Sequence, residues 1–162
     1  MSIPRLSARD MMPEALRGAV IALGNFDGFH LGHQAVAGEA IAQAKAAGMP
    51  AIIATFDPHP VRFFAPHVPW FRLTTLEQRQ RLFAEAGADA MLVFDFDAEL
   101  AATTAEDFVI KLLAERLGVS GVVTGEDFTF GKARGGNIAV LKELGEPLGL
   151  TSIAVGPVSD GE

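Results

Sequence analysis

The chain has 162 residues, the length of one ordinary domain. Its apolar fraction of 49% and charged fraction of 20% are typical of a globular protein and not of a disordered one. The formal net charge of −7 argues against a nucleic-acid-binding protein, and the absence of cysteine excludes disulfides, thiolate catalysis and cysteine-ligated zinc.

The sequence predicts neither a signal peptide nor a membrane span. The N-terminal stretch MSIPRLSARDMMPEALRG lacks an apolar core of signal-peptide length. No stretch approaches the ~20 apolar residues that cross a bilayer. We therefore expect a cytoplasmic protein without membrane or nucleic-acid partners, and the sequence leaves its oligomeric state open.

Short apolar runs alternate with helix signals along the chain. Five nearly continuous apolar runs predict strands that are buried on both faces of a parallel sheet: 19–23, 51–55, 90–94, 121–124 and 151–155. Start and stop residues mark four helices between them. The first spans 31–47 and ends before Gly48, and the second spans 76–86, after a capping box of Thr74 and Glu77 and before Gly87. The third spans 105–117, after Thr104 with Asp107 and before Gly118, and the fourth spans 138–144, between Asn137 and Gly145.

This alternation predicts a single domain with a doubly wound, Rossmann-like α/β fold and a five-stranded parallel sheet. In such folds, ligands bind outside the carboxyl ends of the strands, near the point where the strand order reverses. Three stretches rich in glycine, proline, histidine or aromatic residues follow strand ends, at 24–33, 56–72 and 125–136. We expect the binding site to form where these stretches meet.

Two histidines stand at the predicted start of the first long helix. The N-terminus of a helix disfavours an imidazolium, but a bound anion reverses that preference. Together with Gly32, which allows close backbone approach, His30 and His33 therefore predict a phosphate site. A role as ordinary surface or cap residues is the alternative. A zinc pair is less favoured, because metalloenzyme helices more often carry H-E-x-x-H or glutamate–histidine pairs.

The stretch 125–136, GEDFTFGKARGG, invites comparison with a P-loop. That motif requires four residues between its glycines and a serine or threonine after the lysine. Here five residues separate Gly125 from Gly131, and Ala133 follows Lys132, so the P-loop interpretation fails. What remains is a glycine-rich loop that carries one carboxylate and two cations, with a solvated surface loop as the alternative.

Three separated motifs occur in the order found in one family. GNFDGFHLGH (24–33) contains the H-x-G-H signature of α/β nucleotidyltransferases, TFDPHP (55–60) follows the second predicted strand, and GEDFTFGKARGG follows the fourth. Through nearly its whole length the chain resembles the N-terminal, FMN-adenylylating module of prokaryotic bifunctional riboflavin kinase/FAD synthetases. Full-length members of that family also carry riboflavin kinase activity.

The resemblance implies a reaction and its residues. The reaction is ATP + FMN → FAD + pyrophosphate, with Mg²⁺ as cofactor and without a covalent enzyme intermediate. The resemblance implies that His30, His33 and Asp127 are catalytic, with Asp127 at the FMN phosphate and metal region, while the metal ligands stay unassigned. The implied ATP-binding residues are Gly24, Asn25, Phe26, Asp27, His30, Gly32 and His33. The implied flavin-binding residues are Phe56, Pro58, His59, Asp127, Phe128 and Arg134.

The aromatic residues around the second motif allow two interpretations. Each could be core or part of a packed lid, or the set could form an apolar wall for the isoalloxazine ring: Phe56, Phe63, Phe64, Trp70 and Phe71. Phe128 and Phe130 alternate along the chain, so we expect one to face the core and the other to face the flavin.

Two alternatives to FMN adenylylation stay open. The first is an H-x-G-H adenylyltransferase that acts on phosphopantetheine or nicotinate mononucleotide. The second is a catalytically idle nucleotide- or flavin-binding module. The family continues after a D-G-E like that at 160–162 into a serine/threonine–arginine phosphate motif and then the riboflavin kinase module, and the resemblance places both outside these 162 residues.

Overall fold

The computed structural model describes residues 2–24, 26, 31–57 and 74–156. Its strands form one sheet in the order β1-β4-β3-β2-β5-β6, and every neighbouring pair is parallel. The strands are β1 (Arg5–Ser7), β2 (Val20–Leu23), β3 (Ala51–Asp57), β4 (Ala90–Asp95), β5 (Gly121–Gly125) and β6 (Thr151–Val155). The expected Rossmann-like α/β fold is confirmed.

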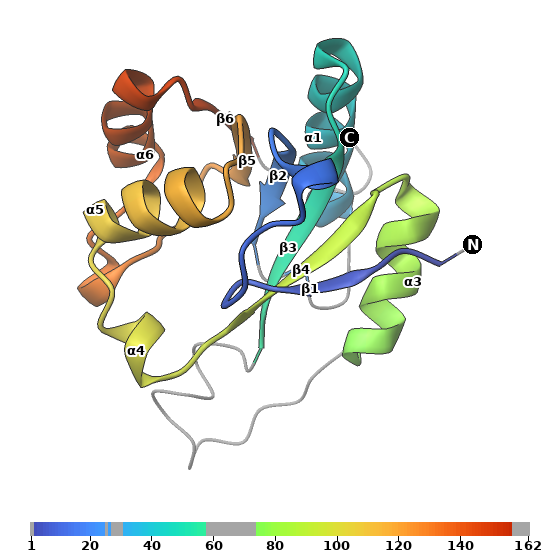
Figure 1. Ribbon diagram of the computed structural model, residues 1–162, viewed down its shortest axis with the longest axis horizontal. Coiled ribbons are helices and arrows are strands. Elements are labelled where there is room, and N and C mark those ends of the chain that lie inside the picture. The colour runs from blue at the N-terminus through green and yellow to red at the C-terminus, as the bar shows by residue number, and fades with distance from the viewer. Residues whose placement is uncertain (1, 25, 27–30, 58–73, 157–162) are drawn as a thin grey trace.

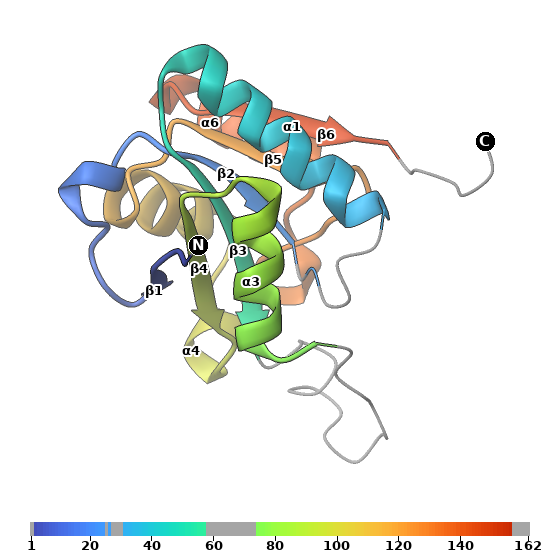
Figure 2. The same cartoon turned by 90° about the vertical axis from the view of Figure 1, so that its right-hand side faces the viewer.

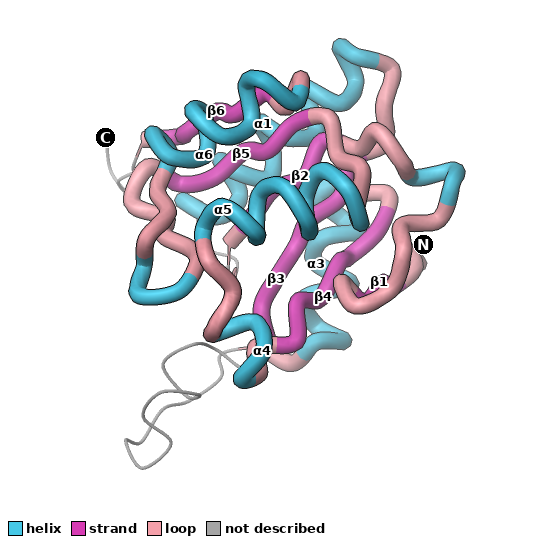
Figure 3. The backbone as a smooth tube through the Cα atoms, turned by 60° about the vertical axis from the view of Figure 1, so that its left-hand side comes forward, coloured by secondary structure: helices cyan, strands magenta, loops and turns pink. Residues whose placement is uncertain are grey.

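Helices cover both faces of this sheet. α1 (Leu31–Ala47) and α3 (Leu76–Ala86) lie on one face (Figures 1 and 2). On the other face lie α5 (Ala105–Asp107), which continues into the π-helical segment η2 (Phe108–Arg116), and α6 (Ile138–Gly145) (Figure 3). The short helices are α4 (Ala98–Ala101) and the 3₁₀ turns η1 (Glu14–Leu16), η3 (Lys132–Arg134) and η4 (Glu146–Leu148).

Two apolar clusters, one on each face of the sheet, form the core. Successive side chains of β3 alternate between them: Ile52 and Ala54 pack on the side of η2, whereas Ala51 and Ile53 pack on the side of α1 and α3. Both positions of the alternation are apolar because both faces are covered. This double burial explains why the central strands read as continuous apolar runs in the sequence.

The prediction of five strands was wrong by one. The additional strand, β1, contains only Arg5, Leu6 and Ser7, and its residues are exposed or half-buried at the edge of the sheet. Such a short, polar segment carries no alternation that a sequence pattern could detect. Side chains of α3 hold it: Gln80 Oε1 accepts from Arg5 Nε at 3.0 Å, and Gln80 Nε2 donates to the carbonyl of Ile3 at 2.7 Å.

An ion pair between Arg5 and Glu77 lies beside these contacts. Arg5 Nη2 is 3.7 Å from Glu77 Oε1. The pKa of Glu77 lies below its ordinary value, first because its carboxylate accepts a backbone hydrogen bond and further because of the charge on Arg5. The carboxylate is therefore favoured in its charged form at the first turn of α3.

The predicted start of α3 was wrong by one residue. Thr75 Oγ1 accepts from the N–H of Gln78 at 3.1 Å, and Gln78 Oε1 accepts from the N–H of Thr75 at 2.8 Å, so the capping box consists of these two residues and not of Thr74 and Glu77. Two adjacent threonines followed by Glu-Gln satisfy the motif in either register, and the sequence alone does not distinguish them.

Other helix ends agree with the sequence, with one exception. α1 ends before Gly48, whose φ is +67°, and the side chains of Thr104 and Asn137 cap α5 and α6 as predicted. Gly145 does not end α6 with a left-handed turn, since the chain continues into η4 and turns at Gly149. A Cβ on Gly145 would approach the side chain of Leu150 to 3.0 Å, so Leu150 packs closely against this glycine.

Across the described residues, no helix is long and apolar enough to cross a membrane.

We predict that Gly131→Ala destabilises the fold. Gly131 has a φ of +81°, and a Cβ there would lie 2.7 Å from the backbone nitrogen of Ala105. We expect a loss of about 1–3 kcal/mol in the free energy of unfolding, measured by urea denaturation. Gly38→Ala in α1 is the matched control, because nothing lies within 4 Å of its added Cβ; it should gain about 1 kcal/mol. Equal stabilities for the two variants would contradict the packing seen here.

Candidate functional site

The strand order places a cleft between the carboxyl ends of β2 and β5. The chain leaves β2 toward β3 on one side, whereas β5 and β6 lie on the other, so the connections diverge at this point. The space encloses about 250 Å³ and is called here the β2–β5 cleft. Its lining residues are Leu23, Gly24, Phe26, Gly32, His33, Val36, Gly125, Glu126, Asp127, Phe128, Val155 and Gly156.

The β2 side of the cleft is built around a buried phenylalanine. Phe26 is 2% exposed although its φ is +57°, a conformation that is strained for a side-chain-bearing residue. Its ring packs edge-on against His33, with centroids 5.3 Å apart, and against Phe83 of α3 at 6.0 Å. A Cβ on Gly24 would lie 3.1 Å from the same ring. Packing against His33 and Phe83 therefore holds Phe26 in its strained conformation.

The first turn of α1 supplies the centre of the cleft wall. Gly32 and His33 are half-buried there, and Val36, three residues further on, lies on the same helix face. α1 is 17 residues long, so its first N–H groups carry the partial positive charge of a full helix dipole. N–H groups at a helix N-terminus, beside an imidazole, are groups that bind an anion such as phosphate.

The β5 side of the cleft carries two exposed carboxylates, Glu126 and Asp127. The N–H of Glu126 donates to the carbonyl of Val155 at 3.1 Å, and the N–H of Phe128 donates to the carbonyl of Gly125 at 3.1 Å. These bonds form a turn at the end of β5 and join it to β6. The two carboxylates therefore extend from a fixed turn opposite the start of α1.

Phe128 joins the cleft to the core. Its ring is stacked on Phe56, with centroids 6.3 Å apart, and on Phe130 at 6.2 Å. Phe130 and Phe56 are both buried, at 6% and 7% exposure, whereas Phe128 is half-buried and lines the cleft. Phe56 also stacks on Phe94 at 5.1 Å. Phe56 is thus a core residue that supports the cleft wall from beneath.

The structure brings together about half of the predicted site residues. Gly24, Phe26, Gly32, His33, Asp127 and Phe128 line one cleft. Arg134 is exposed on η3 and does not line it; Arg134 and Ala133 both have positive φ, at 54° and 56°. Phe56, expected to bind the flavin, does not line the cleft either but lies in the core against Phe128. The other expected positions lie outside the described residues: Asn25, Asp27, His30, Pro58, His59, Phe63, Phe64, Trp70 and Phe71.

Sequence reasoning missed part of the cleft wall. Val36, Glu126, Val155 and Gly156 line it but belong to none of the predicted site residues. The position of Val155 and Gly156 at the end of a predicted strand was the available signal, because strand ends meet at one edge of a parallel sheet. Glu126 lies within the motif GEDFTFGKARGG, but the sequence predicted no role for it.

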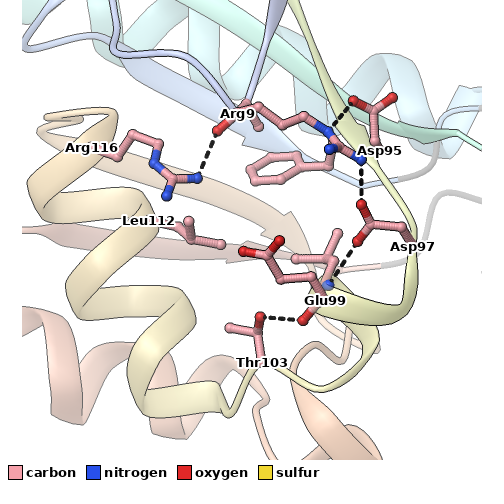
Figure 4. A pocket seen from close by; sticks show the side chains of 10 residues that line it. Arg9, Asp95, Asp97, Glu99, Thr103, Leu112 and Arg116 are labelled. Atoms are coloured by element: carbon pink, nitrogen blue, oxygen red, sulfur yellow. Dashed lines mark hydrogen bonds and ion pairs between the residues drawn. The ribbon is translucent and has the colours of Figure 1, made fainter.

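A smaller hollow at the end of β4 contains the two ion pairs of Arg9 (Figure 4). Arg9 Nε donates to Asp95 Oδ2 at 3.0 Å and Arg9 Nη2 to Asp97, while Arg116 Nη1 donates to the carbonyl of Ala8 at 3.2 Å. The space holds about 60 Å³, which is too small for a nucleotide. These contacts tether the segment after β1 to β4.

Two further hollows flank α3 and enclose about 330 and 410 Å³. Side chains of one helix face line most of each, and neither contains a strand end or a glycine-rich turn. The β2–β5 cleft is the better candidate because it combines a helix N-terminus, carboxylates and an aromatic wall at the topological switch.

Comparison with known proteins identifies the family. The family model described as FAD synthetase matches residues 12–162. The chain belongs to the FAD synthetase family.

Curated relatives carry the same family's names. The chain is 36% identical over 132 residues to the bifunctional riboflavin kinase/FMN adenylyltransferase of Escherichia coli (strain K12), covering 82% of this chain and 42% of that protein. It is also 36% identical over 135 residues to the protein of the same name from Pseudomonas fluorescens, covering 83% and 43%. The chain therefore spans about two fifths of the length of these relatives.

A solved structure shares the FAD synthetase fold seen here. The crystal structure titled as a macrolide-efflux protein from Streptococcus pneumoniae superposes with a TM-score of 0.82 at 25% identity. The match covers 98% of this chain and 52% of that one. The fold of nearly all of these 162 residues thus recurs within a larger protein.

We predict that the substitution Phe26→Ala destabilises the fold. The ring is buried against His33 and Phe83, so its loss should lower the free energy of unfolding by about 3–5 kcal/mol, measured by thermal or urea denaturation. Leu31→Ala is the control: its side chain is 48% exposed at the start of α1, and we expect a change within about 0.5 kcal/mol. A Phe26→Ala variant as stable as its control would show that the loop is not packed as described.

Proposed function

We propose that this chain transfers AMP from ATP to FMN, which yields FAD and pyrophosphate. Membership in the FAD synthetase family and the names of the curated relatives support this activity. The single structural observation that carries it is the β2–β5 cleft, where His33 of the H-x-G-H motif lies at the N-terminus of α1 opposite Asp127. A cytoplasmic location, where both substrates are available, is part of the same proposal.

The enzyme catalyses this reaction by aligning the substrates and neutralising charge, without a covalent enzyme intermediate. An FMN phosphate oxygen attacks the α-phosphorus of ATP, a new P–O bond forms, and the bond to the bridging α–β oxygen breaks, so that pyrophosphate leaves. Negative charge grows on the leaving group during this step. Donors fixed at the site of that charge stabilise the transition state without reorganising.

We assign the phosphates of ATP to the first turn of α1. The helix N–H groups and the imidazole of His33 are the donors there, and His30 completes the H-x-G-H motif in the same role. Gly24, Asn25, Phe26, Asp27 and Gly32 belong to the proposed nucleotide loop. Because the ring of Phe26 is buried, we propose that this residue contributes its backbone and holds His33 in place.

We assign FMN to the β5 and β3 ends of the cleft. Phe128 offers a half-buried aromatic face that is braced by Phe56, and flat rings stack well on such surfaces. Pro58, His59 and Arg134 complete the proposed flavin side. Asp127 lies at the turn where the FMN phosphate would approach the nucleotide.

Mg²⁺ fits the groups that the cleft offers. Asp127 and Glu126 present carboxylate oxygens, the ligands that Mg²⁺ prefers. In the part of the chain that the structure describes, no group of three histidines or carboxylates could hold a metal alone, which agrees with an ion that takes most of its ligands from substrate phosphates and water. When bound, the ion would neutralise charge on the triphosphate.

The test is release of pyrophosphate from ATP and Mg²⁺ with and without FMN. We expect FMN-dependent release by the unmodified chain and a loss of about 100-fold or more in a His30→Ala/His33→Ala variant, because the donors to the phosphates are removed. Glu39→Gln, on α1 outside the cleft, is the control and should keep the full rate.

Acceptor specificity is measured in the same assay. Phosphopantetheine and nicotinate mononucleotide replace FMN in parallel reactions, and we expect pyrophosphate only with FMN. Release with another acceptor would overturn FMN as the substrate. Binding of ATP or FMN without any release would indicate an idle binding module.

A further inference from the structure

A buried arginine on α3 contacts the end of β3. Arg79 is 2% exposed, the least accessible arginine of the described residues. Its Nη1 donates to Thr55 Oγ1 at 2.9 Å, and its Nη2 donates to the carbonyl of Thr74 at 3.4 Å. The guanidinium therefore joins α3 to β3 and to the residue that precedes the capping box.

Fold stability alone does not require a charged and a polar side chain at this position. Thr55 occupies the β3 position that faces α3, in series with Ala51 and Ile53, where an apolar side chain would continue the core. Removing a guanidinium from water is costly, and well-packed apolar replacements of buried charged groups are often equally stable or more so. We therefore ask what Arg79 and Thr55 contribute to the neighbouring β2–β5 cleft.

Thr55 lies at the edge of the sheet where the substrates meet. It follows the pair formed by Leu23 and Ala54, so it stands level with the start of the loop after β2. The next residue, Phe56, turns to the opposite face and stacks on Phe128, whose ring lines the β2–β5 cleft. Contacts thus run from Arg79 through Thr55 and Phe56 to the proposed flavin wall.

A second residue of α3 supports the nucleotide side separately. Phe83, one helical turn after Arg79, packs against Phe26 at 6.0 Å, and Phe26 packs against His33. General damage to α3 should therefore affect ATP and FMN alike, whereas loss of the guanidinium removes the hydrogen bond to Thr55 of β3 and leaves the packing of Phe83 on Phe26 in place. This difference makes the role of Arg79 measurable.

We propose that Arg79 is a positioning residue for the flavin substrate. It holds the carboxyl end of β3, and through it Phe56 and Phe128, in the orientation that accepts FMN. The inference rests on the proposed FMN adenylyl transfer and adds a residue outside the three sequence motifs. Arg79 itself does not line the cleft.

The test compares Arg79→Met with Arg79→Lys, Thr55→Val and the control Arg81→Met. Arg81 lies two residues further along α3 and is exposed. In Arg79→Met we expect KM for FMN to rise about 10-fold or more while KM for ATP stays within about twofold, because only one substrate's wall is displaced. Arg79→Lys should recover part of the loss, since it keeps the charge and one donor, and Arg81→Met should match the unmodified chain.

Thr55→Val tests the same contact without removing a charge. Valine has nearly the shape of threonine but no acceptor for Arg79 Nη1, so we expect KM for FMN to rise about threefold or more at an unchanged KM for ATP. Circular dichroism and thermal melting establish that each variant is folded. If Arg79→Met does not fold, Thr55→Val and Arg79→Lys carry the test.

Two results would overturn the inference, and they are distinguishable from failure of the proposed function. If the unmodified chain is active and the folded Arg79→Met and Thr55→Val variants have unchanged KM values, Arg79 does not position the flavin. That result would overturn this inference and leave the proposed function in place. Equal losses for ATP and FMN would show a purely structural role. An unmodified chain that makes no FAD from ATP and FMN would overturn the proposed function, and this inference with it.

Discussion

The pairing of β2 with β3 on one side and β5 on the other is the constraint on which the site depends. Because the chain leaves β2 toward β3 on one side and leaves β5 toward β6 on the other, the connections that follow these two strands diverge at their carboxyl ends. The N-terminus of α1 opens into the cleft between them. The cleft is therefore a consequence of strand order, and the motif residues supply its chemistry.

The net charge of −7 is compatible with the two phosphate-bearing substrates that we propose, because the proposed anion site is local. The N–H groups at the start of α1 and the imidazole of His33 provide donors without adding net basic surface. Glu126 and Asp127 face this region from β5, and a divalent cation between carboxylates and phosphates would turn their charge into an attraction. An overall acidic chain can thus bind the proposed anionic substrates in this cleft.

Much of the fold could be predicted from the sequence, because strands buried on both faces leave long apolar runs and glycine or threonine marks most helix ends. The edge strand β1 left no such signal, since Arg5–Ser7 is short and half-exposed. The site was harder. The H-x-G-H spacing identified His33 as a site residue. Tertiary packing, which no local pattern encodes, decides that Phe26 belongs to the core, that Phe56 lies beneath the cleft and that Arg79 is buried.

The most direct test of the central claim is a crystal structure of the chain with Mg²⁺, FMN and a non-hydrolysable ATP analogue. The account predicts the triphosphate against the first turn of α1, between Gly24 and Asp127, with the flavin ring on Phe128. A nucleotide bound elsewhere, such as along α3, or a triphosphate that avoids the start of α1, would contradict it.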